Sequence, residues 1–557
     1  MRVTLAKEET EDPTRGWGTT LAERLEKPLA ALVFFVAFLW FAQKIQLATA
    51  DLGRHIMNGR MLARGASRVL DTNFYSITEP ARTVLNHHWG AGVIFNFVHE
   101  KLGFEGLSLF YGLLMAASVL LFYLAARRRA GSSVALVAVL LVLPVAATRR
   151  EIRPEGFSYL FLGLFLWAWD RAHLEVASRT GARNEPSSGA PRPQLSLVKL
   201  WWLIPLQILW VNLHIFFFLG PFCAACAVIG EAVNGRPWRR AALFALLLAL
   251  SCLANPFGFH GALAPLTIFE EYGYMLAENQ HVFFMQERFS GNPAYLHFEI
   301  LAALTLGAIF WMIHKREARR HLAGLVVLLL LGTLAICAVR GFTLFALAFI
   351  PACATFLAFL CRILLPRSAR LLRDACLGLS TILLVVAVFP SHYLSPFSIT
   401  SGLGLFPNAI SNDRPMAFFK LLKAQGPIFN NYDIGGYLIF HLFTNEPSYS
   451  VFVDNRPEAY SAAFFKETYI PMQADEDRWR EAMAKYNFGA IIFYRRDLTP
   501  WGQPFLIRRL EDPEWAPVYA SENDDVIIYL RRTEANRRNI ELMEPQVRKM
   551  FRVTRNG

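Results

Sequence analysis

The sequence predicts an all-α polytopic membrane bundle of about eleven transmembrane helices, followed by a C-terminal α/β domain outside the membrane. The chain has 557 residues, of which 54% are hydrophobic and only 18% are charged. Soluble proteins carry about 25% charged residues, so most of this chain is expected to contact lipid. The apolar residues form long runs between residues 29 and 390, whereas the charge density after residue 412 is that of a soluble protein.

Residues 1–28 are polar and are predicted to be a cytoplasmic N-terminal segment, with residues 29–390 as the transmembrane domain. A run of about 20 apolar residues crosses a bilayer, and somewhat shorter runs nearly cross it. Such runs lie at 29–49, 106–126, 132–148, 157–170, 200–213, 215–232, 241–255, 298–313, 322–339, 343–364 and 375–390. The pair within 200–232 forms either two helices or one long broken helix.

The positions of the basic residues indicate the topology of the chain. Lys and Arg resist translocation, so loops rich in them stay in the cytoplasm. Such loops lie at 127–131, 171–199, 234–240, 314–321 and 366–374. The formal net charge of +12 therefore indicates membrane topology and not a nucleic-acid partner. The long loops 51–105 and 256–297 and the C-terminal domain then lie outside, which predicts a multi-pass membrane protein with its N-terminus in the cytoplasm.

A linker at 391–411 leads to the C-terminal domain at 412–532, and residues 533–557 form a polar tail that is either helical or disordered. Short β-rich runs alternate with helical patterns in this domain, which favours an α/β sandwich. The strand candidates are 427–430, 448–454, 488–494, 516–520 and 526–530. The helix candidates are 414–424, 434–442, 475–485 and 504–510.

The first outer loop, residues 51–105, concentrates groups that can carry chemistry. Asp51 directly follows the first apolar run, and His55, Asp71 and His88 lie in the same loop. Ionisable residues at membrane depth are functional candidates, and a positioned carboxylate can act as a general base. Asp51 and Asp71 are therefore the catalytic candidates, and His55 and His88 are predicted to bind substrate. Residues 51–64 and 89–99 are expected to form helices at the membrane surface.

Further candidates lie at the outer ends of later spans. Arg153 and Glu155 belong to a charged cluster on a side of the membrane where basic residues are disfavoured. Binding of an anionic group such as a lipid phosphate would explain this cluster, and internal ion pairs are the alternative explanation. His214 interrupts an apolar run, and Arg340 stands alone between two spans. We predict that these four residues bind substrate.

The sequence carries no recognisable nucleotide or metal motif. The phosphate-loop patterns GxGxxG and GxxxxGK[ST] are absent, as are HExxH and GxSxG. We therefore expect no nucleotide cofactor and assign no metal ligand, while a divalent metal stays open as a cofactor. All seven cysteines lie in apolar runs, so the C-terminal domain has none with which to form a disulfide.

Short strings in the outer loops resemble those of the GT-C superfamily of bacterial polytopic membrane glycosyltransferases. The strings are DLGRHIMNG at 51–59, DTNFYS at 71–76, NHHW at 86–89, RPE at 153–155 and NLH at 212–214. This resemblance covers residues 29–390 in architecture. It implies that an acidic residue of the first outer loop, at the position of Asp51, acts as base or orients the acceptor. The usual pair of adjacent acids is absent, since Leu52 follows Asp51, so Asp51 and Asp71 both stay candidates and metal dependence stays open.

The resemblance implies transfer of a sugar from a polyprenyl-phosphate-linked donor to an extracytoplasmic glycan, lipid or protein, with the C-terminal domain helping to bind the acceptor. One alternative is a transporter or flippase of a lipid-linked or envelope component, and another is a non-catalytic scaffold or sensor. Transporters usually place ionisable residues near the middle of the membrane. The apolar runs here are nearly free of charge, which favours chemistry at the outer surface. The sugar, the acceptor and the oligomeric state stay open.

Overall fold

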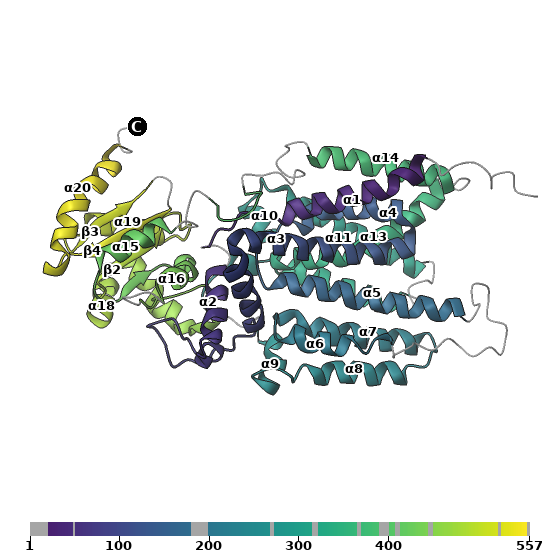
Figure 1. The fold of residues 1–557 in the computed structure, drawn as a ribbon, viewed down its shortest axis with the longest axis horizontal. Coiled ribbons are helices and arrows are strands. Elements are labelled where there is room, and N and C mark those ends of the chain that lie inside the picture. Colours follow the sequence, from purple (N-terminus) through teal and green to yellow (C-terminus); the bar gives the residue numbers. More distant parts are fainter. Residues whose placement is uncertain are drawn as a thin grey trace, which may run out of the picture.

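The computed structural model describes residues 21–47, 51–179, 199–267, 272–314, 321–364, 369–388, 400–406, 413–443, 449–521 and 525–553. Figure 1 shows a helical bundle along the long axis of the molecule, with the C-terminal domain beyond one end of it. The helix α2 (Leu52–Ala63) lies between these two parts. The predicted N-terminal segment 1–28 and linker 391–411 fall mostly outside the described residues.

Each predicted apolar run coincides with a helix of the bundle. The helices are α1 (Leu21–Phe41), α3 (Trp89–Ala130), α4 (Ser132–Ala146), α5 (Glu155–Arg179), α6 (Leu203–Val211), α7 (Leu219–Val233), α8 (Arg239–Ser251), α11 (Pro293–His314), α12 (Leu322–Cys337), α13 (Phe342–Leu364) and α14 (Ala369–Val388). Residues 200–232 form two helices, because the chain at His214 is extended between α6 and α7. In α3 the backbone bends at Gly103, whose φ of 67° is one that glycine adopts without steric strain.

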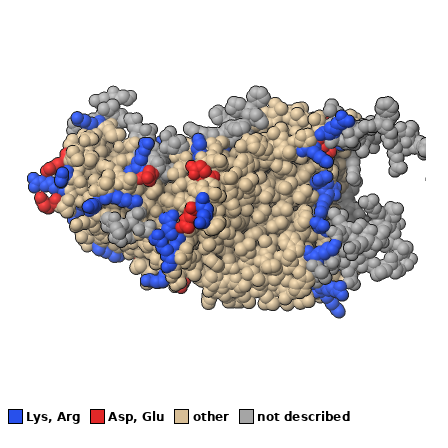
Figure 2. Space-filling model, viewed as in Figure 1, with Lys and Arg blue, Asp and Glu red and all other residues tan. Residues whose placement is uncertain are grey.

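Four helical segments among the described residues are long and apolar enough to cross a membrane. They are Trp89–Ala130, Ile215–Val233, Pro293–His314 and Val339–Cys361, and two shorter apolar helices accompany them. The predicted number of about eleven spans is therefore not confirmed. Figure 2 shows a broad uncharged area on the visible face of the bundle. Lys and Arg gather at the end remote from the C-terminal domain, and charges of both signs lie nearer the domain.

The helix α2 forms where the sequence predicts one, but most of its residues are buried between other parts of the protein. It packs between α3 and the domain helix α16 (Gly435–Leu442). A Cβ atom added at Gly59 would lie 2.2 Å from the carbonyl oxygen of Gly92, and one added at Gly53 would lie 2.7 Å from that of Gly436. Glycine at both positions thus allows the backbones to approach closely, which fixes the start of α2 against both parts of the molecule.

The C-terminal domain is built on a four-stranded sheet in the order β1-β2-β4-β3. Its strands are β1 (Ile428–Asn430), β2 (Ala490–Tyr494), β3 (Trp515–Ala520) and β4 (Val526–Arg531). The first two strands are parallel and the other pairings are antiparallel. The predicted strand at 448–454 was wrong for its described residues, because they form only a single bridge, from Val451 to Ser76 of the first outer loop.

Helices cover both faces of this sheet, as an α/β sandwich requires. Side chains of alternating direction divide the strands between two apolar clusters. Phe429 and Ile491 pack with α18 (Glu476–Tyr486) and α19 (Gly502–Glu511), whereas Ile428 and Ile492 join the cluster of α15 (Arg414–Leu422) and α16. The tail forms α20 (Arg537–Val553), the helical one of the two predicted outcomes.

Candidate functional site

A cavity of about 560 Å³ lies where one end of the bundle, the loop 51–105 (the predicted first outer loop) and the C-terminal domain meet. Every predicted site residue except Asp71 lines this cavity. These residues are Asp51, His55, His88, Arg153, Glu155, His214 and Arg340. They come from four separate stretches of the chain, so the tertiary structure brings them together.

The structure does not bring Asp71 to the cavity. Its side chain is exposed, and its backbone carbonyl accepts a hydrogen bond of 2.9 Å from the amide of Val84. Within the described part of the chain, its carboxylate receives no hydrogen bond and therefore does not cap the turn that follows. Of the two acidic candidates, only Asp51 is positioned to meet a ligand in the cavity.

Asp51 occupies an unusual backbone position directly before α2. Its φ of 54° lies in the left-handed region, which costs about 1 kcal/mol for a residue with a side chain and is tolerated best by Asn and Asp. One carboxylate oxygen lies 3.4 Å from a guanidinium nitrogen of Arg54. Burial raises the pKa of Asp51 to about 6, against the opposing effects of Arg54 and Arg153. A carboxylate with this pKa can accept a proton at neutral pH more readily than an ordinary aspartate.

Four histidines, His55, His87, His88 and His214, line the cavity with Asp51, and three of them were predicted as site residues. The ring centroids of His55 and His88 lie 5.6 Å apart, and those of His88 and His214 lie 5.1 Å apart in a stacked arrangement. Burial lowers the pKa of all three, so these imidazoles are neutral at pH 7. The Nδ1 atom of His55 and the Nε2 atom of His88 are buried without a hydrogen-bond partner among the described residues. A hydroxyl group of a ligand could satisfy either atom.

The tautomer of His214 follows from its neighbours. Its Nδ1 atom lies 2.8 Å from the hydroxyl of Ser158 and 3.3 Å from the amide nitrogen of Phe216. The indole N–H of Trp210 donates to the same Ser158 oxygen at 2.7 Å, so the serine proton is directed at the imidazole. His214 therefore accepts at Nδ1 and carries its proton on Nε2.

The arginines on the bundle side of the cavity are extensively paired with acids. Arg149 pairs with Glu155, and both Arg149 and Arg153 lie 3.1 Å from Glu278. Arg153 also lies 2.8 Å from Glu151. The charged cluster at 149–155 thus contains the internal ion pairs that the sequence left as an alternative. The ion pair with Arg149 occupies Glu155, so Glu155 positions this arginine.

Arg340 has a different environment. One of its terminal nitrogens donates to the side-chain oxygen of Asn279 at 2.9 Å. Its Nε atom is buried without a partner, and no ion pair to it is found in the described part of the chain. Arg340 therefore keeps hydrogen-bond donors for an anion in the cavity.

The domain side of the cavity carries acids that the sequence analysis did not select as site residues. Burial, and next Asp497 and Asp51, raise the pKa of Asp433 to about 7. Burial also raises the pKa of Glu458. The side-chain nitrogen of Asn455 donates to the backbone carbonyl of Asp433 at 3.0 Å and fixes the turn directly before α16.

The sequence marks some of these additional cavity residues more clearly than others. Asp433 precedes the predicted helix 434–442 and its paired glycines, and Asn455 directly follows the predicted strand 448–454. Glu278 and Glu458 lie in stretches of sequence without a distinguishing pattern, and only their long-range contacts mark them. No sequence spacing could have placed Glu278 beside Arg149 and Arg153.

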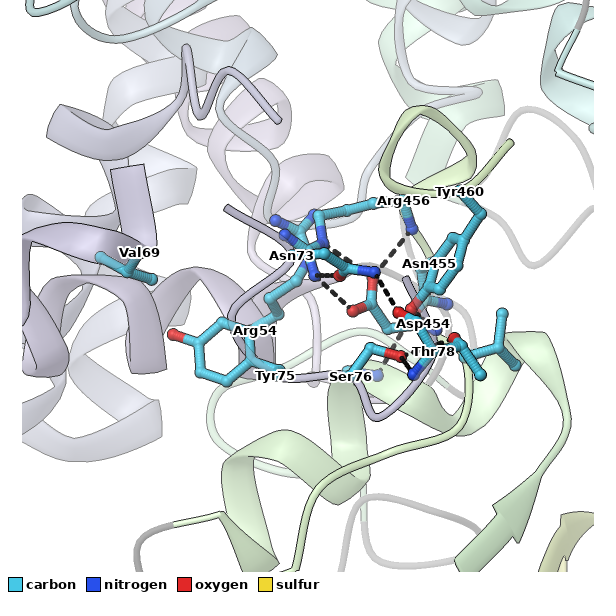
Figure 3. A network of polar contacts seen from close by, with 12 residues as sticks. Arg54, Val69, Asn73, Tyr75, Ser76, Thr78, Asp454, Asn455, Arg456 and Tyr460 are labelled. Carbon is cyan, nitrogen blue, oxygen red and sulfur yellow. Dashed lines mark hydrogen bonds and ion pairs between the residues drawn. The ribbon is translucent and has the colours of Figure 1, made fainter. Parts of the chain in front are cut away.

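A buried polar network attaches the first outer loop to the C-terminal domain (Figure 3). Arg456 forms an ion pair of 2.6 Å with Asp454 and donates to the side-chain oxygen of Asn73 at 2.8 Å. The hydroxyls of Ser76 and Thr78 donate to the carbonyl of Phe452 at 2.9 and 2.6 Å. These contacts hold the domain over the cavity.

The described residues contain no group of three or more His, Cys, Asp and Glu side chains that could hold a metal ion. No cavity residue is therefore assigned as a metal ligand.

The overall fold matches that of known enzymes. Archaeal oligosaccharyltransferase AglB from Archaeoglobus fulgidus, in complex with an inhibitory peptide and a dolichol-phosphate, superimposes with a TM-score of 0.57 at 11% identity, covering 91% of this chain and 75% of that chain. The apo form of the Archaeoglobus fulgidus oligosaccharyltransferase gives 0.55 at 11% identity, with 83% and 69% covered. This chain has a GT-C-like fold.

At the level of the fold, this likeness agrees with the architecture that the outer-loop strings imply by their resemblance to the GT-C superfamily. ArnT from Cupriavidus metallidurans, bound to undecaprenyl phosphate, matches with a TM-score of 0.47 at 12% identity over 92% of this chain and 98% of its own. No protein-family model matches the sequence, and the comparison with curated proteins gives no match. The long apolar helices support a membrane location for the chain.

Proposed function

We propose that this protein is a membrane glycosyltransferase that moves a sugar from a polyprenyl-phosphate-linked donor to an acceptor outside the cytoplasm. One observation carries the proposal: Asp51, Arg340 and His214 meet in a single cavity at the end of the bundle covered by the C-terminal domain. A carboxylate with a raised pKa beside a cation with free donors is what transfer from a phosphate leaving group requires. The dolichol-phosphate held by the structural neighbour AglB supports the choice of donor class.

In the proposed reaction, the carboxylate of Asp51 accepts the proton of the acceptor hydroxyl. The acceptor oxygen forms a bond to the anomeric carbon of the sugar, and the bond from this carbon to the phosphate oxygen breaks. The polyprenyl phosphate leaves with the bonding electron pair, and Arg340 stabilises its added negative charge. His55 and His88 offer unpaired ring nitrogens to hydroxyl groups of the substrates.

The proposed orientation puts the cavity on the outer face of the bacterial inner membrane, with the N-terminus in the cytoplasm. The concentration of Lys and Arg at the opposite end of the bundle supports this orientation. A reporter fused after residue 557 should then behave as extracytoplasmic. Cytoplasmic reporter activity would contradict the orientation and the outer-face acceptor.

The decisive experiment measures transfer of a labelled sugar from a polyprenyl-phosphate donor in proteoliposomes. Asp51→Asn keeps the size of the side chain but removes the proton acceptor, so the rate should fall about 10²- to 10⁴-fold. Asp71→Asn is the matched control, with the same chemical change in the same loop on an exposed side chain, and should cost at most about threefold. If the wild type transfers sugar and only Asp71→Asn is inactive, the assignment of the base is wrong. If the wild type transfers from no such donor, transport of a lipid-linked component becomes the better proposal.

A further inference from the structure

A second cavity, of about 470 Å³, lies beside the first at the same end of the bundle. Its lining combines the cations Lys44 and Arg150 with apolar side chains such as Met285. Arg153 and Glu278 line both cavities, so the wall between them includes this ion pair. Any molecule that occupies the two cavities together must separate the two charges.

Glu278 reaches this wall from another part of the chain. It lies in the short helix η5 (Ala277–Asn279), within the long outer segment between α9 (Gly258–Leu263) and α10 (Val282–Arg288). A single carboxylate oxygen of Glu278 accepts hydrogen bonds from Arg149 and Arg153, each at 3.1 Å. The neighbouring Asn279 accepts from Arg340 at 2.9 Å. One turn of an outer loop therefore engages three arginines that converge from two other segments.

The chemistry of this contact resembles the binding of a phosphate. Guanidinium groups bind carboxylate and phosphate oxygens with the same geometry. Arg149 and Arg153 each have a second acid from their own segment, Glu155 and Glu151, which balances their charge. A carboxylate and a phosphodiester both carry one negative charge, so exchanging one for the other leaves the charge of the cluster unchanged. A diphosphate would bring additional negative charge.

The carboxylate of Glu278 is kept ionised in this position. Burial by itself would raise its pKa, but Arg153, Arg149 and Arg340 together hold the pKa well below its usual range. Its side chain is 29% exposed, so the side chain is already partly in contact with solvent. An ionised and partly exposed carboxylate can be replaced by a competing anion.

We propose that Glu278 occupies the phosphate site of the lipid donor before the donor binds, and that the phosphodiester of the donor displaces it. This inference rests on the proposed function and names the residue that gates its donor site. When Glu278 leaves, the two cavities join, and the apolar side chains of the second cavity face the first part of the lipid tail. The phosphate then lies against Arg149, Arg153 and Arg340, in the same cavity as Asp51.

The test is direct binding of undecaprenyl phosphate, the leaving group of the proposed reaction and therefore a ligand of the same phosphate site, to the full-length protein in dodecyl maltoside micelles. Glu278→Gln keeps the size of the side chain but removes the competing charge, so affinity should rise about tenfold. Glu287→Gln is the matched control, because Glu287 is an exposed acid of α10 in the same outer segment, and should bind as the wild type does. Thermal unfolding of each variant checks that it is folded.

A second measurement needs no substitution. Ligand contact usually slows amide hydrogen exchange, but displacement of η5 should speed exchange at residues 276–281 of the wild type when undecaprenyl phosphate is added. Equal or weaker binding by folded Glu278→Gln, or slower exchange in this segment, would overturn the gate and leave the proposed function intact. Absence of binding to all three proteins would overturn the gate and the donor class together.

Discussion

The two walls of the first cavity differ in the charged groups that they present. The bundle wall presents Arg153, which is paired with acids, and Arg340, which has no ion pair among the described residues, whereas the domain wall presents Asp433 and Glu458. Asp51 lines the same cavity. Arginines suit a lipid phosphate, and carboxylates suit the hydroxyl or amino groups of an acceptor. Under the proposed function, we therefore expect donor and acceptor to approach Asp51 from opposite walls.

The two walls face each other only while the C-terminal domain stays attached to the bundle. The largest expected effect therefore comes from a substitution that breaks the polar network between the first outer loop and the domain. Arg456→Ala leaves Asp454 buried and unpaired and removes the contact to Asn73. Loss of one partner of a buried ion pair typically costs about 3–5 kcal/mol, so thermal unfolding of the domain should occur at a clearly lower temperature. Arg480→Ala removes an exposed ion pair and should change stability by less than about 0.5 kcal/mol. Equal stability of the two variants would show that the network does not hold the domain.

The role of the bundle wall in binding the lipid phosphate is tested next by Arg340→Gln. Hydrogen bonds between charged groups contribute about 1.5–3 kcal/mol, so the affinity for undecaprenyl phosphate should fall about 10- to 150-fold. Arg340→Lys should recover only part of this loss, because an ammonium cannot make two parallel bonds to phosphate. Arg288→Gln, on an exposed residue of α10, controls for loss of a positive charge. Unchanged affinity in Arg340→Gln would remove Arg340 from the donor site.

A substitution on the domain wall should have a smaller effect, and this effect should fall on the acceptor and not on the lipid. Asp433→Asn should raise the KM for the acceptor about tenfold while leaving the affinity for undecaprenyl phosphate unchanged. Steady-state kinetics with the acceptor varied, together with a lipid-binding measurement, separate these quantities. A loss of lipid affinity as large as that of Arg340→Gln would contradict the assignment of the two walls to different substrates.

The smallest predicted effect concerns pH. Asp51 must be deprotonated to act as a base, and its pKa is raised to about 6. The value of kcat/KM should therefore reach a plateau above about pH 7 and fall about tenfold per unit well below pH 6. Arg54 lowers the pKa of Asp51, so Arg54→Gln should move this acidic limb to higher pH. A limb that does not move with Arg54→Gln would assign the titration to another group.

Local patterns predicted much of the architecture, because helices and strands have fixed periods along the chain. The apolar runs lie on the bundle helices, and the alternation of strands and helices after residue 412 gives the sheet and its covering helices. The exception at 448–454 is instructive. This apolar stretch satisfies its backbone partly through side chains and a bridge to Ser76, a partner far away in the sequence.

The sequence by itself determined the kinds of groups available for chemistry and the spans from whose outer ends they emerge. Asp51, His214 and Arg340 could be selected because each interrupts or ends an apolar run, where a polar side chain is costly. Only the tertiary structure separated Asp51 from Asp71, buried α2 and brought Glu278 to the arginines. These outcomes depend on contacts between distant segments, which are set by how helices and loops pack and leave no period in the local sequence.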